Sequence, residues 1–396
     1  MHTPLRRSTS TSPSPPRAGA RSRPGPGGKT STVACQTARQ KSSSDSESDL
    51  TAAGAEDTSG RADEMDGTAD GALPKGIREC PVFYPTDEEF ANFEAYVRSI
   101  EPQCLEHGIC KVVPPKGWTP RVTPYAAKDG MMLNAPIRQE SVGHGGQFQC
   151  MNVQQKAMTI GEFKKLALKQ ENCPPLSEQE LEVQRNSDVP FLELERRYWQ
   201  GLGVSSNPPV YGADNFSETL FEDCAGAWNL SRLDSLLRQR IHTTIPGVNA
   251  PYLYMGMWRA TFAWHVEDMD LYSINFLHYG AEKVWYSASA ADGKRLEGIA
   301  ASIFPNSANR CGQFLRHKMH IINPSLITAR GMHLTRVVHR AGEFVISFPY
   351  AYHCGFNVAL NCAESCNFAS ERWVPYGLKV KPCKCFASEG AVKIKM

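Results

Sequence analysis

The chain has 396 residues, 41% of them hydrophobic and 21% charged, and its 43 basic and 41 acidic residues leave a net charge of +2. So small a net charge excludes the strongly basic surface of a protein that binds nucleic acid regardless of sequence. No apolar run reaches the roughly 18 residues of a membrane span, and the polar N-terminus has no signal-peptide core. Because no secretory signal is visible, we expect the 13 cysteines to be reduced thiols, some of them metal ligands, in a protein of the cytosol or nucleus.

Residues 1–76 contain no aromatic side chain, because the first is Phe83. Residues 1–29 are basic and rich in Pro and Ser, whereas residues 45–70 are acidic. Such a segment buries too little apolar surface to offset the entropy of ordering, so we expect a disordered tail over 1–76. Its early arginines suit a nuclear-import signal or, more commonly for such runs, a solvated tail.

The next unit, residues 77–121, begins with a helix signal. Thr86 and Glu89 have the spacing of a capping box, and Phe90, Phe93 and Val97 follow at helical spacing. The pattern predicts a helix over this stretch, and the sequence from Pro114 to Trp118 closes the unit.

Helical spacing gives way to β patterns further along the chain. Residues 157–171 predict a second helix, and Phe191–Trp199 is compatible with a helix or an extended segment. Beyond residue 240 the pattern is that of a β-barrel or sandwich with helical decoration, so we expect a mixed α+β protein. The predicted strands are Tyr272–Phe276 (ended by Gly280), Val284–Tyr286, Val337–Val338 and Phe344–Phe348, with a helix at Lys294–Ile303.

His265-Val266-Glu267 is the most informative motif. Of the 11 histidines only His265 is followed two residues later by an acid. Residues two apart on a strand point the same way, so both side chains can reach one ion. His353, in a Tyr-His-Cys-Gly segment, is the best third candidate, and two histidines with one carboxylate form the ligand set of non-haem Fe(II) oxygenases. On spacing alone, an acid near a surface histidine is the commoner explanation.

Lys283 and Asn275 follow this motif on predicted strands. A lysine within the apolar run Lys283–Tyr286 is costly to bury unless it is paired, and a dicarboxylate cosubstrate would pair it. A lysine on an edge strand facing water is an equally good interpretation of the sequence.

These residues lie within a longer resemblance. The stretch from Gly247 to Asn275, together with Phe348–Phe356 and Asn361–Ser365, resembles the JmjC domain of histone lysine demethylases, and Pro85–Trp118 resembles the JmjN domain. The pairing of both domains is similar to the lysine-specific demethylase 4 group, from about residue 78 nearly to the end.

The resemblance implies a fold and an activity. It implies a JmjN domain at 77–121, a connecting helical and β region at 122–209, a JmjC distorted double-stranded β-helix (a cupin-like jelly roll) at 210–376 and a zinc-binding segment at 377–396. It also implies an Fe(II)- and 2-oxoglutarate-dependent dioxygenase that uses O₂ to hydroxylate N-methyl groups of tri- or dimethylated lysine in the histone H3 tail, at lysine 9, lysine 36 or both, with release of formaldehyde. A nuclear, chromatin-associated enzyme is expected, with the nucleosome as partner, without a membrane and without sequence-specific DNA binding.

The resemblance also assigns roles to residues of this sequence. The iron ligands would be His265, Glu267 and His353. The 2-oxoglutarate site would consist of Tyr211, Asn275 and Lys283, with Phe262 and Trp285 as walls. The methyl-lysine pocket would include Gly247, Tyr252, Tyr254, Asp214 and Ser365, with Cys366 beside them. For Tyr252 and Tyr254, ordinary strand packing is the better explanation if the family is left aside.

A second metal is suggested by Cys311, His317, Cys383 and Cys385. Three cysteines and one histidine are typical of structural zinc. The spacings, six residues from Cys311 to His317 and two from Cys383 to Cys385, are short and only moderately specific. The lysine-specific demethylase 4 group carries such a zinc clamp at matching positions.

Two cysteines depart from the family pattern. Cys366 stands where relatives carry Thr or Ala and would alter methyl-state preference if it lined the pocket. Cys354 replaces a small residue after His353, where a thiol would make the iron site more prone to oxidation. Two other functions remain open: a protein hydroxylase with the same iron centre, and a catalytically silent histone-binding module.

Overall fold

The computed structural model describes residues 73–177, 192–203 and 207–385. These residues all belong to one compact unit within 59–396. Most of the predicted tail, residues 1–72, lies outside the described residues. Within the described ranges, no helix is both long and apolar enough to cross a membrane.

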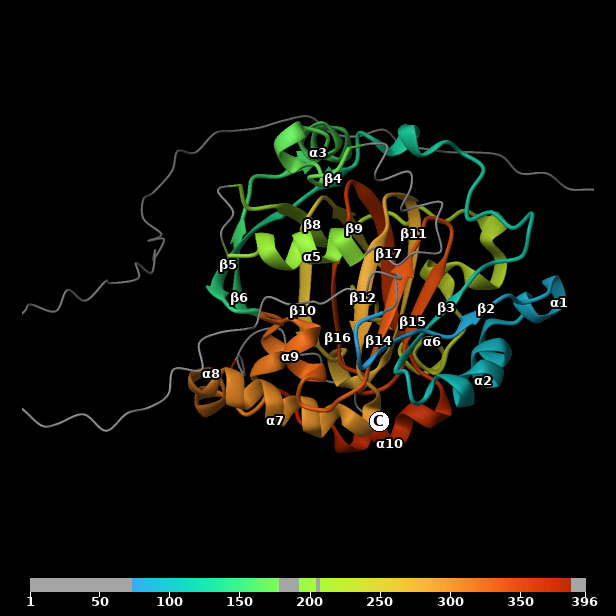
Figure 1. The fold of residues 1–396 in the computed structure, drawn as a ribbon. Coiled ribbons are helices and arrows are strands. Elements are labelled where there is room, and N and C mark those ends of the chain that lie inside the picture. The colour runs from blue at the N-terminus through green and yellow to red at the C-terminus, as the bar shows by residue number, and fades with distance from the viewer. Residues whose placement is uncertain (1–72, 178–191, 204–206, 386–396) are drawn as a thin grey trace, which may run out of the picture. The chain divides into compact units, whose positions relative to one another are not determined.

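Two large sheets form the framework (Figure 1). The five-stranded sheet has the order β1 (Ile77–Glu79), β14 (Leu334–His339), β12 (Lys283–Ser287), β16 (His353–Asn357) and β10 (Thr261–His265). The ten-stranded sheet has the order β13 (His320–Ile322), β6 (Gln147–Gln154), β5 (Ile137–His144), β8 (Val210–Asn215), β9 (Tyr252–Gly256), β17 (Asn361–Phe368), β11 (Tyr272–Gly280), β15 (Phe344–Ser347), β3 (Ile109–Val112) and β2 (Val82–Phe83). A small sheet pairs β4 (Met132–Leu133) with β7 (Met158–Thr159).

The two large sheets face each other across a small apolar core. Ile109 and Val345 from one sheet and Trp285 and Val337 from the other belong to it, so the two inner faces touch. Pairing is mostly antiparallel, as in β10–β16 and β11–β17. The mixed α+β class and the cupin-like arrangement of two sheets are confirmed.

Helices cover the outer faces of both sheets. The helices are α1 (Asp87–Phe90), α2 (Phe93–Cys104), α3 (Ile160–Ala167), α5 (Leu192–Gly201), α6 (Leu236–Arg240), α7 (Gly293–Ile303), α8 (Pro305–Arg310), α9 (Pro324–Thr328) and α10 (Val374–Lys379). Helices α5 and α7 pack through Leu194 and Leu296 onto the five-stranded sheet, in a core with Tyr286. Helix α2 packs through Phe93 onto the ten-stranded sheet, in a core with Phe276.

The helix predicted from Thr86 onward is two helices. Thr86 and Glu89 do form the capping box of α1, but the chain leaves the helix after Phe90. Asn92 then caps α2, its side chain accepting a hydrogen bond from the backbone of Ala95 at 3.0 Å. The apolar spacing continues across the break, and this is why periodicity alone joined the two helices.

Of the other predicted elements, one helix is shorter than expected and the rest are confirmed or decided by the structure. The helix predicted at 157–171 is shortened to α3, because Thr159 forms a second capping box with Glu162 and the preceding residues are strand. The undecided segment is helical in α5, with Phe191 outside the described residues. The predicted helix at Lys294–Ile303 and the four predicted strands are confirmed as α7, β11, β12, β14 and β15.

The N-terminal unit contributes strands to both large sheets. β1 pairs with β14, and β3 pairs with β15. An aromatic cluster joins the same unit to the sheets, with Phe90 stacked on Trp228 at 4.3 Å and Trp228 against Phe344 at 4.9 Å. Strands β1 and β3 therefore complete the two large sheets.

Candidate functional site

Antiparallel pairing brings two histidines together at one end of the five-stranded sheet. His265 ends β10, His353 begins β16, and the two are direct register partners with ring centroids 4.3 Å apart. Glu267 follows in extended conformation, and its Oε1 lies 3.8 Å from Nε2 of His265 and 3.2 Å from Nε2 of His353. Ligand atoms of all three residues lie within 4.8 Å of one another. His265 and Glu267 were expected to share a face, and they do.

Hydrogen bonds fix which imidazole nitrogen faces the cluster. Nδ1–H of His265 donates to the carbonyl of Ala263 at 2.7 Å, and Nδ1–H of His353 donates to that of Ala351 at 3.1 Å. Because a carbonyl only accepts, Nδ1 is the donor in both rings, and Nε2 is the nitrogen that each ring would offer to a metal. Burial and the neighbouring His353 lower the pKa of His265 to about 3, so this ring is neutral at physiological pH.

The Glu267 carboxylate is held from its other side. Asn367 donates to Oε2 of Glu267 at 2.9 Å and to the carbonyl of Tyr272 at 3.1 Å. Burial acts to raise the pKa of Glu267, but the hydrogen bond from His353 and nearby positive charge hold it well below its usual value. The site therefore presents one carboxylate oxygen and two imidazole nitrogens as donors.

The three donors line a cavity of about 140 Å³. It brings together most of the predicted residues: His265, Glu267, His353, Tyr211, Asn275, Lys283, Phe262, Trp285, Tyr254, Asp214 and Ser365. Gly247, Tyr252 and Cys366 are not among its lining residues.

Lys283 lies deep in this cavity wall. Its strand β12 is central, between β14 and β16, and its side chain is 1% exposed, so an edge lysine facing water is excluded. Its ammonium donates to Oδ1 of Asn357 at 2.7 Å, and no carboxylate of the described residues forms an ion pair with it. Burial lowers the pKa of Lys283 to about 7. An unneutralised buried cation is costly, so its position points to an anionic ligand.

Two further lining residues have buried polar atoms without a partner in the described part of the chain. These are Oδ1 of Asn275 and Nε1 of Trp285. The Trp285 ring packs edge-on against Phe262 at 4.7 Å. Buried polar groups are nearly always hydrogen-bonded, so unpaired ones beside a cavity fit a polar ligand.

The tyrosine pair lies on β9 beside the cavity. Tyr254 donates its hydroxyl hydrogen to Asp214 at 2.8 Å, so its oxygen lone pairs remain available. Tyr252 stands against Gly247, where an added Cβ would lie 2.3 Å from the tyrosine ring. The two tyrosines share one side of β9, while Leu253 between them is buried.

The expectation that Cys366 joins Ser365 in the pocket is not met. Adjacent strand residues face opposite sides of the sheet. Ser365 lines the cavity, whereas Cys366 belongs to the core beneath β17, its sulfur 3.7 Å from the carbonyl of Leu230. Its thiol has no route to a substrate in this cavity.

Cys354 also turns away from the histidine beside it. It is 2% exposed in the core on the outer side of the five-stranded sheet, and burial raises its pKa well above the usual value. Because thiolates are the oxidisable form, this thiol is less reactive than a free cysteine. The expected oxidation liability therefore does not follow from its position.

The predicted cysteine and histidine cluster is assembled. Ligand atoms of Cys311, His317, Cys383 and Cys385 lie within 4.8 Å of one another. Sγ of Cys383 lies 3.6 Å from Sγ of Cys311 and 3.1 Å from Nε2 of His317. A disulfide needs sulfurs about 2 Å apart, whereas ligands about 2.3 Å from one tetrahedral ion lie about 3.8 Å apart. The spacing therefore fits a metal ion.

The pKa shifts of two cysteines in this cluster also fit a metal-binding site. Partial burial acts to raise the pKa of Cys383, but hydrogen bonds from the Cys385 backbone and from His317 lower it to about 7. Contact with the sulfurs of Cys311 and Cys383 raises the pKa of Cys385 to about 11. A cation among them would favour thiolate at every sulfur.

Sequence reasoning missed three residues at the site. Asn357 contacts Lys283, Asn367 holds Glu267, and Lys318 lines the cavity in a left-handed conformation with φ of 55°. Only Lys318 had a signal, because it directly follows the metal-cluster candidate His317. The two asparagines carry no motif and reach their partners through the fold.

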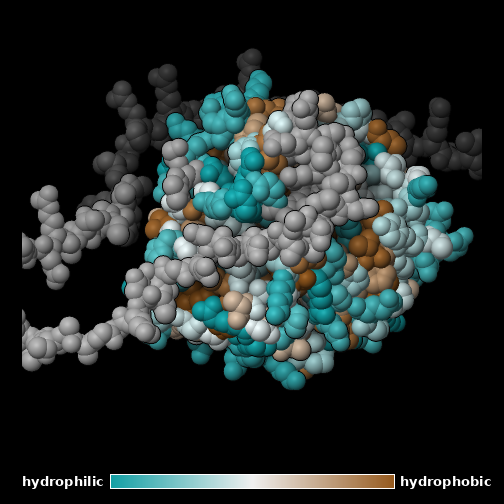
Figure 2. All heavy atoms as spheres, viewed as in Figure 1, coloured by the Kyte–Doolittle hydropathy of each residue, from teal (hydrophilic) through white to brown (hydrophobic). Residues whose placement is uncertain are grey.

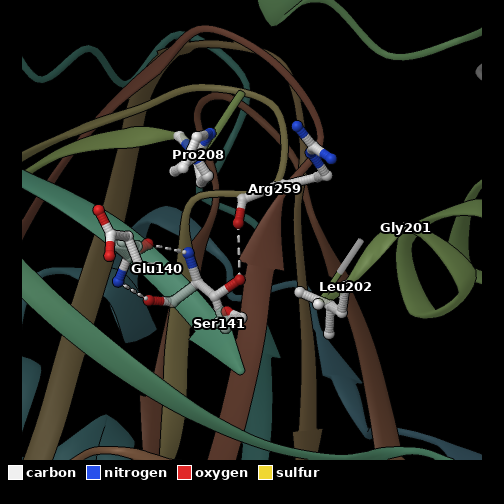
Figure 3. A pocket seen from close by; sticks show the side chains of 10 residues that line it. Glu140, Ser141, Gly201, Leu202, Pro208 and Arg259 are labelled. Carbon is white, nitrogen blue, oxygen red and sulfur yellow. Dashed lines mark hydrogen bonds between the residues drawn. The ribbon is translucent and has the colours of Figure 1, made fainter. Parts of the chain in front are cut away.

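A second hollow of about 220 Å³ adjoins the cavity (Figure 3). Gln139 and Thr261 line both spaces, joined by two hydrogen bonds of 2.8 Å, and so form part of the wall between them. Figure 3 shows the Arg259 side chain turned away from Glu140 and Ser141. No histidine or cysteine of the described residues lines this hollow, so the metal-binding chemistry belongs to the first cavity.

Two domain families match the chain. The JmjC domain, described as a hydroxylase, matches residues 252–368, and the jmjN domain matches residues 81–114. The first range contains His265, Glu267 and His353, together with Asn275 and Lys283.

Three curated proteins are similar over most of the chain. Lysine-specific demethylase 4B of Mus musculus is 46% identical over 318 residues, covering 79% of this chain and 28% of that protein. Probable lysine-specific demethylase 4F of Homo sapiens is 44% identical over 308 residues, covering 76% and 46%. Lysine-specific demethylase 4D of Rattus norvegicus is 41% identical over 309 residues, covering 77% and 58%. The chain thus spans between 28% and 58% of the length of these relatives.

Proposed function

Because the chain is a homologue of the lysine-specific demethylase 4 proteins that carries both a jmjN and a JmjC domain, we propose that it is an Fe(II)- and 2-oxoglutarate-dependent histone lysine demethylase. Its substrate would be tri- or dimethylated lysine of histone H3, at lysine 9, lysine 36 or both. One observation carries the proposal: three metal donors within 4.8 Å share a cavity with a buried lysine that has no ion-pair partner in the described chain.

His265, Glu267 and His353 would hold the iron. Ligands about 2.1 Å from an octahedral ion and at right angles lie about 3 Å apart, close to the spacing of the Glu267 oxygen from the His353 nitrogen, 3.2 Å. Their donors cover one face and leave the cavity side open. When iron, O₂ and 2-oxoglutarate are bound, the site would couple decarboxylation of the oxo acid to succinate with hydroxylation of an N-methyl carbon, whose hemiaminal product releases formaldehyde.

Lys283 would pair with the distal carboxylate of 2-oxoglutarate. The Tyr211 hydroxyl and the Asn275 side chain line the same cavity, so the Tyr211 O–H and the Asn275 amide N–H would donate hydrogen bonds to the ligand's oxygens. Phe262 and Trp285 would exclude water around the ligand, which strengthens the ion pair because the local dielectric is low.

The methylated ammonium would lie beside Glu267 and Ser365, in front of the Tyr254 hydroxyl. Asp214 and Glu267 add negative charge, and a tyrosine oxygen adds an acceptor, so the lining suits a fixed cation with polarised methyl groups. We propose that Tyr252 and the Gly247 carbonyl extend this pocket toward the histone backbone, outside the cavity itself. Cys366 is not part of the proposal.

Cys311, His317, Cys383 and Cys385 would bind one structural zinc ion. This ion would fasten the proposed zinc-binding segment, residues 377–396, to the short 3-10 helix Phe314–His317. We likewise propose the boundaries 77–121, 122–209 and 210–376 for the other parts of the described chain.

The test is a methyl-loss assay on histone H3 peptides trimethylated at lysine 9 or lysine 36. The purified chain with Fe(II), ascorbate and 2-oxoglutarate should remove mass in steps of one methyl group and release formaldehyde. Glu267→Ala should abolish both, while Glu140→Ala, at the neighbouring hollow, should retain them. A gain of one oxygen without methyl loss would favour a protein hydroxylase. Peptide binding without any change in mass would favour a histone-binding module.

A nuclear, chromatin-bound location follows from this substrate. The expected partner is the nucleosomal H3 tail. Imaging of the tagged chain, with extraction of chromatin at rising salt, would test both statements.

A further inference from the structure

Lys283 depends on one side chain for its position. Its ammonium is buried and donates to Oδ1 of Asn357 at 2.7 Å, while the rings of Tyr211 and Phe262 lie 5.7 and 5.8 Å away. The ammonium faces the cavity, whereas Asn357 stands behind it and is not a lining residue. Asn357 would therefore act on a ligand through the side chains that it contacts, chiefly Lys283, with the Tyr211 hydroxyl as a second neighbour.

Asn357 is itself held rigidly. Its Nδ2 donates to the carbonyl of Ala260 at 2.7 Å, which fixes the amide orientation and directs Oδ1 toward Lys283. The same Oδ1 accepts a second hydrogen bond from Nδ2 of Asn361 at 3.0 Å, and both asparagines are 0% exposed. An added Cβ at Gly256 would lie 2.5 Å from Cγ of Asn357, so the two amides fill the space over this glycine.

The amide has a chemical consequence that an acid would not have. An amide oxygen accepts the hydrogen bond but leaves the positive charge of the ammonium uncompensated. An aspartate of the same shape would neutralise it at the same distance and would lose the donor that now bonds the Ala260 carbonyl. The one fixed contact of Lys283 therefore orients its charge without cancelling it.

We infer that Asn357, braced by Asn361, is a positioning residue that keeps the Lys283 charge available and so makes the site select an oxo acid with a second carboxylate. This inference rests on the proposed function, because the dicarboxylate is 2-oxoglutarate. It adds a residue pair, outside the cavity, that sets the cosubstrate preference of the site.

The experiment measures binding by calorimetry on the full chain loaded with Mn(II), without turnover. Two probes differ only at the far end: 2-oxoglutarate and 2-oxopentanoate, which lacks the distal carboxylate. Asn357→Asp should weaken 2-oxoglutarate about tenfold to a hundredfold and leave 2-oxopentanoate within about twofold. An equal loss for both probes, or no loss, would overturn the inference.

A double-mutant cycle tests the route through Lys283. In Lys283→Met the preference for 2-oxoglutarate should be lost, and adding Asn357→Asp should change the ratio of the two affinities no further. A further fall in that ratio would show that Asn357 acts by another route. If the Asn357→Asp variant does not unfold cooperatively, Asn357→Ser replaces it, because serine removes the contact without adding charge. This variant should also reduce the preference for 2-oxoglutarate over 2-oxopentanoate.

The two proposals fail in different ways. If the unmutated chain binds both probes equally, the dicarboxylate site and this inference are both wrong. If the unmutated chain prefers 2-oxoglutarate and Asn357→Asp keeps that preference, only the role of Asn357 is wrong.

Discussion

The protonation of Lys283 makes cosubstrate binding depend on pH. Burial lowers its pKa from 10.5 to about 7, so the ligand-free site loses this proton as the pH rises through 7. A carboxylate needs the ammonium, and binding must then take up a proton. We expect the affinity for 2-oxoglutarate to fall by up to about tenfold per pH unit above 7.

Calorimetry of the Mn(II)-loaded chain at pH 6.5 to 8.5, in buffers of different ionisation enthalpy, measures both the affinity and the proton uptake. Lys283→Arg is the matched variant, because arginine stays protonated and its binding should not vary over this range. Equal affinity of the unmutated chain at both ends of the range would contradict the low pKa.

For single residues, the sequence predicted the candidate metal ligands better than the residues that hold functional side chains in place. The spacing of His265 and Glu267 predicts a shared site, because strand geometry places residues two apart on one face. The same geometry could have excluded Cys366 once Ser365 was assigned to the cavity. Asn357 was beyond prediction, since it comes to Lys283 from 74 residues away and belongs to no motif.

Helix α5 is anchored through a buried ion pair. Glu195 accepts hydrogen bonds from the Arg336 guanidinium and from the Tyr286 hydroxyl, and both charged side chains are at most 2% exposed. Glu195→Ala would leave Arg336 with only Glu79, whose side chain is 53% exposed. We expect the free energy of unfolding to fall by about 3–5 kcal/mol.

The same helix provides the control. Glu193 pairs with Arg196 and Arg197, but its side chain is 39% exposed, so Glu193→Ala should cost less than about 1 kcal/mol. Chemical denaturation of both variants checks the difference. Similar losses for the two variants would show that burial of Glu195 is not what anchors the helix.

Element boundaries were less predictable than element types. Strands such as β11 and β12 were recognised because β-branched and aromatic residues are concentrated there. The break between α1 and α2 was missed because Phe90 and Phe93 keep helical spacing across Asn92, and the cap decides the boundary. The segment leading into Trp199 stayed undecided because its helix is set by contacts such as Tyr198 stacking on Phe356 at 3.7 Å.

For the molecule as a whole, the N-terminal unit is part of the framework. Removing residues 1–118 would take β1 and β3 away, leave the edges of β14 and β15 unpaired, and expose the ring of Trp228. Unpaired edges promote aggregation. We expect the shortened chain to be insoluble or unfolded, as judged by circular dichroism and gel filtration.

Removal of residues 1–72 is the comparison, since none of these residues belongs to the described framework. That chain should keep the thermal midpoint of the full chain. A folded, soluble chain starting at residue 119 would show that the two sheets close without their N-terminal strands.

Zinc removal should release the C-terminal segment. Chelation would free Cys383, whose pKa of about 7 makes it the first cysteine to react with maleimide near neutral pH, whereas buried Cys354 and Cys366 should react only after unfolding. Mass mapping of labelled peptides checks the order. Labelling of Cys354 before Cys383 would contradict both the cluster and the core placement.

Figure 2 shows hydrophobic residues as patches scattered among hydrophilic ones on the visible face. The sequence could predict the class of the framework, because strand patterns and covering helices are local. It could not predict that β1 would pair with β14, because that partnership joins Glu79 to Arg336 across 257 residues.

This long-range pairing imposes an order on biosynthesis. A ribosome adds about 5–20 residues per second, so the strand at Ile77–Glu79 waits tens of seconds for its neighbour to be made. His353 emerges later still, and Cys385 after it. The proposed metal sites can therefore form only after His353 and Cys385 have been made, and until Leu334–His339 is synthesised the nascent chain carries an unpaired strand edge.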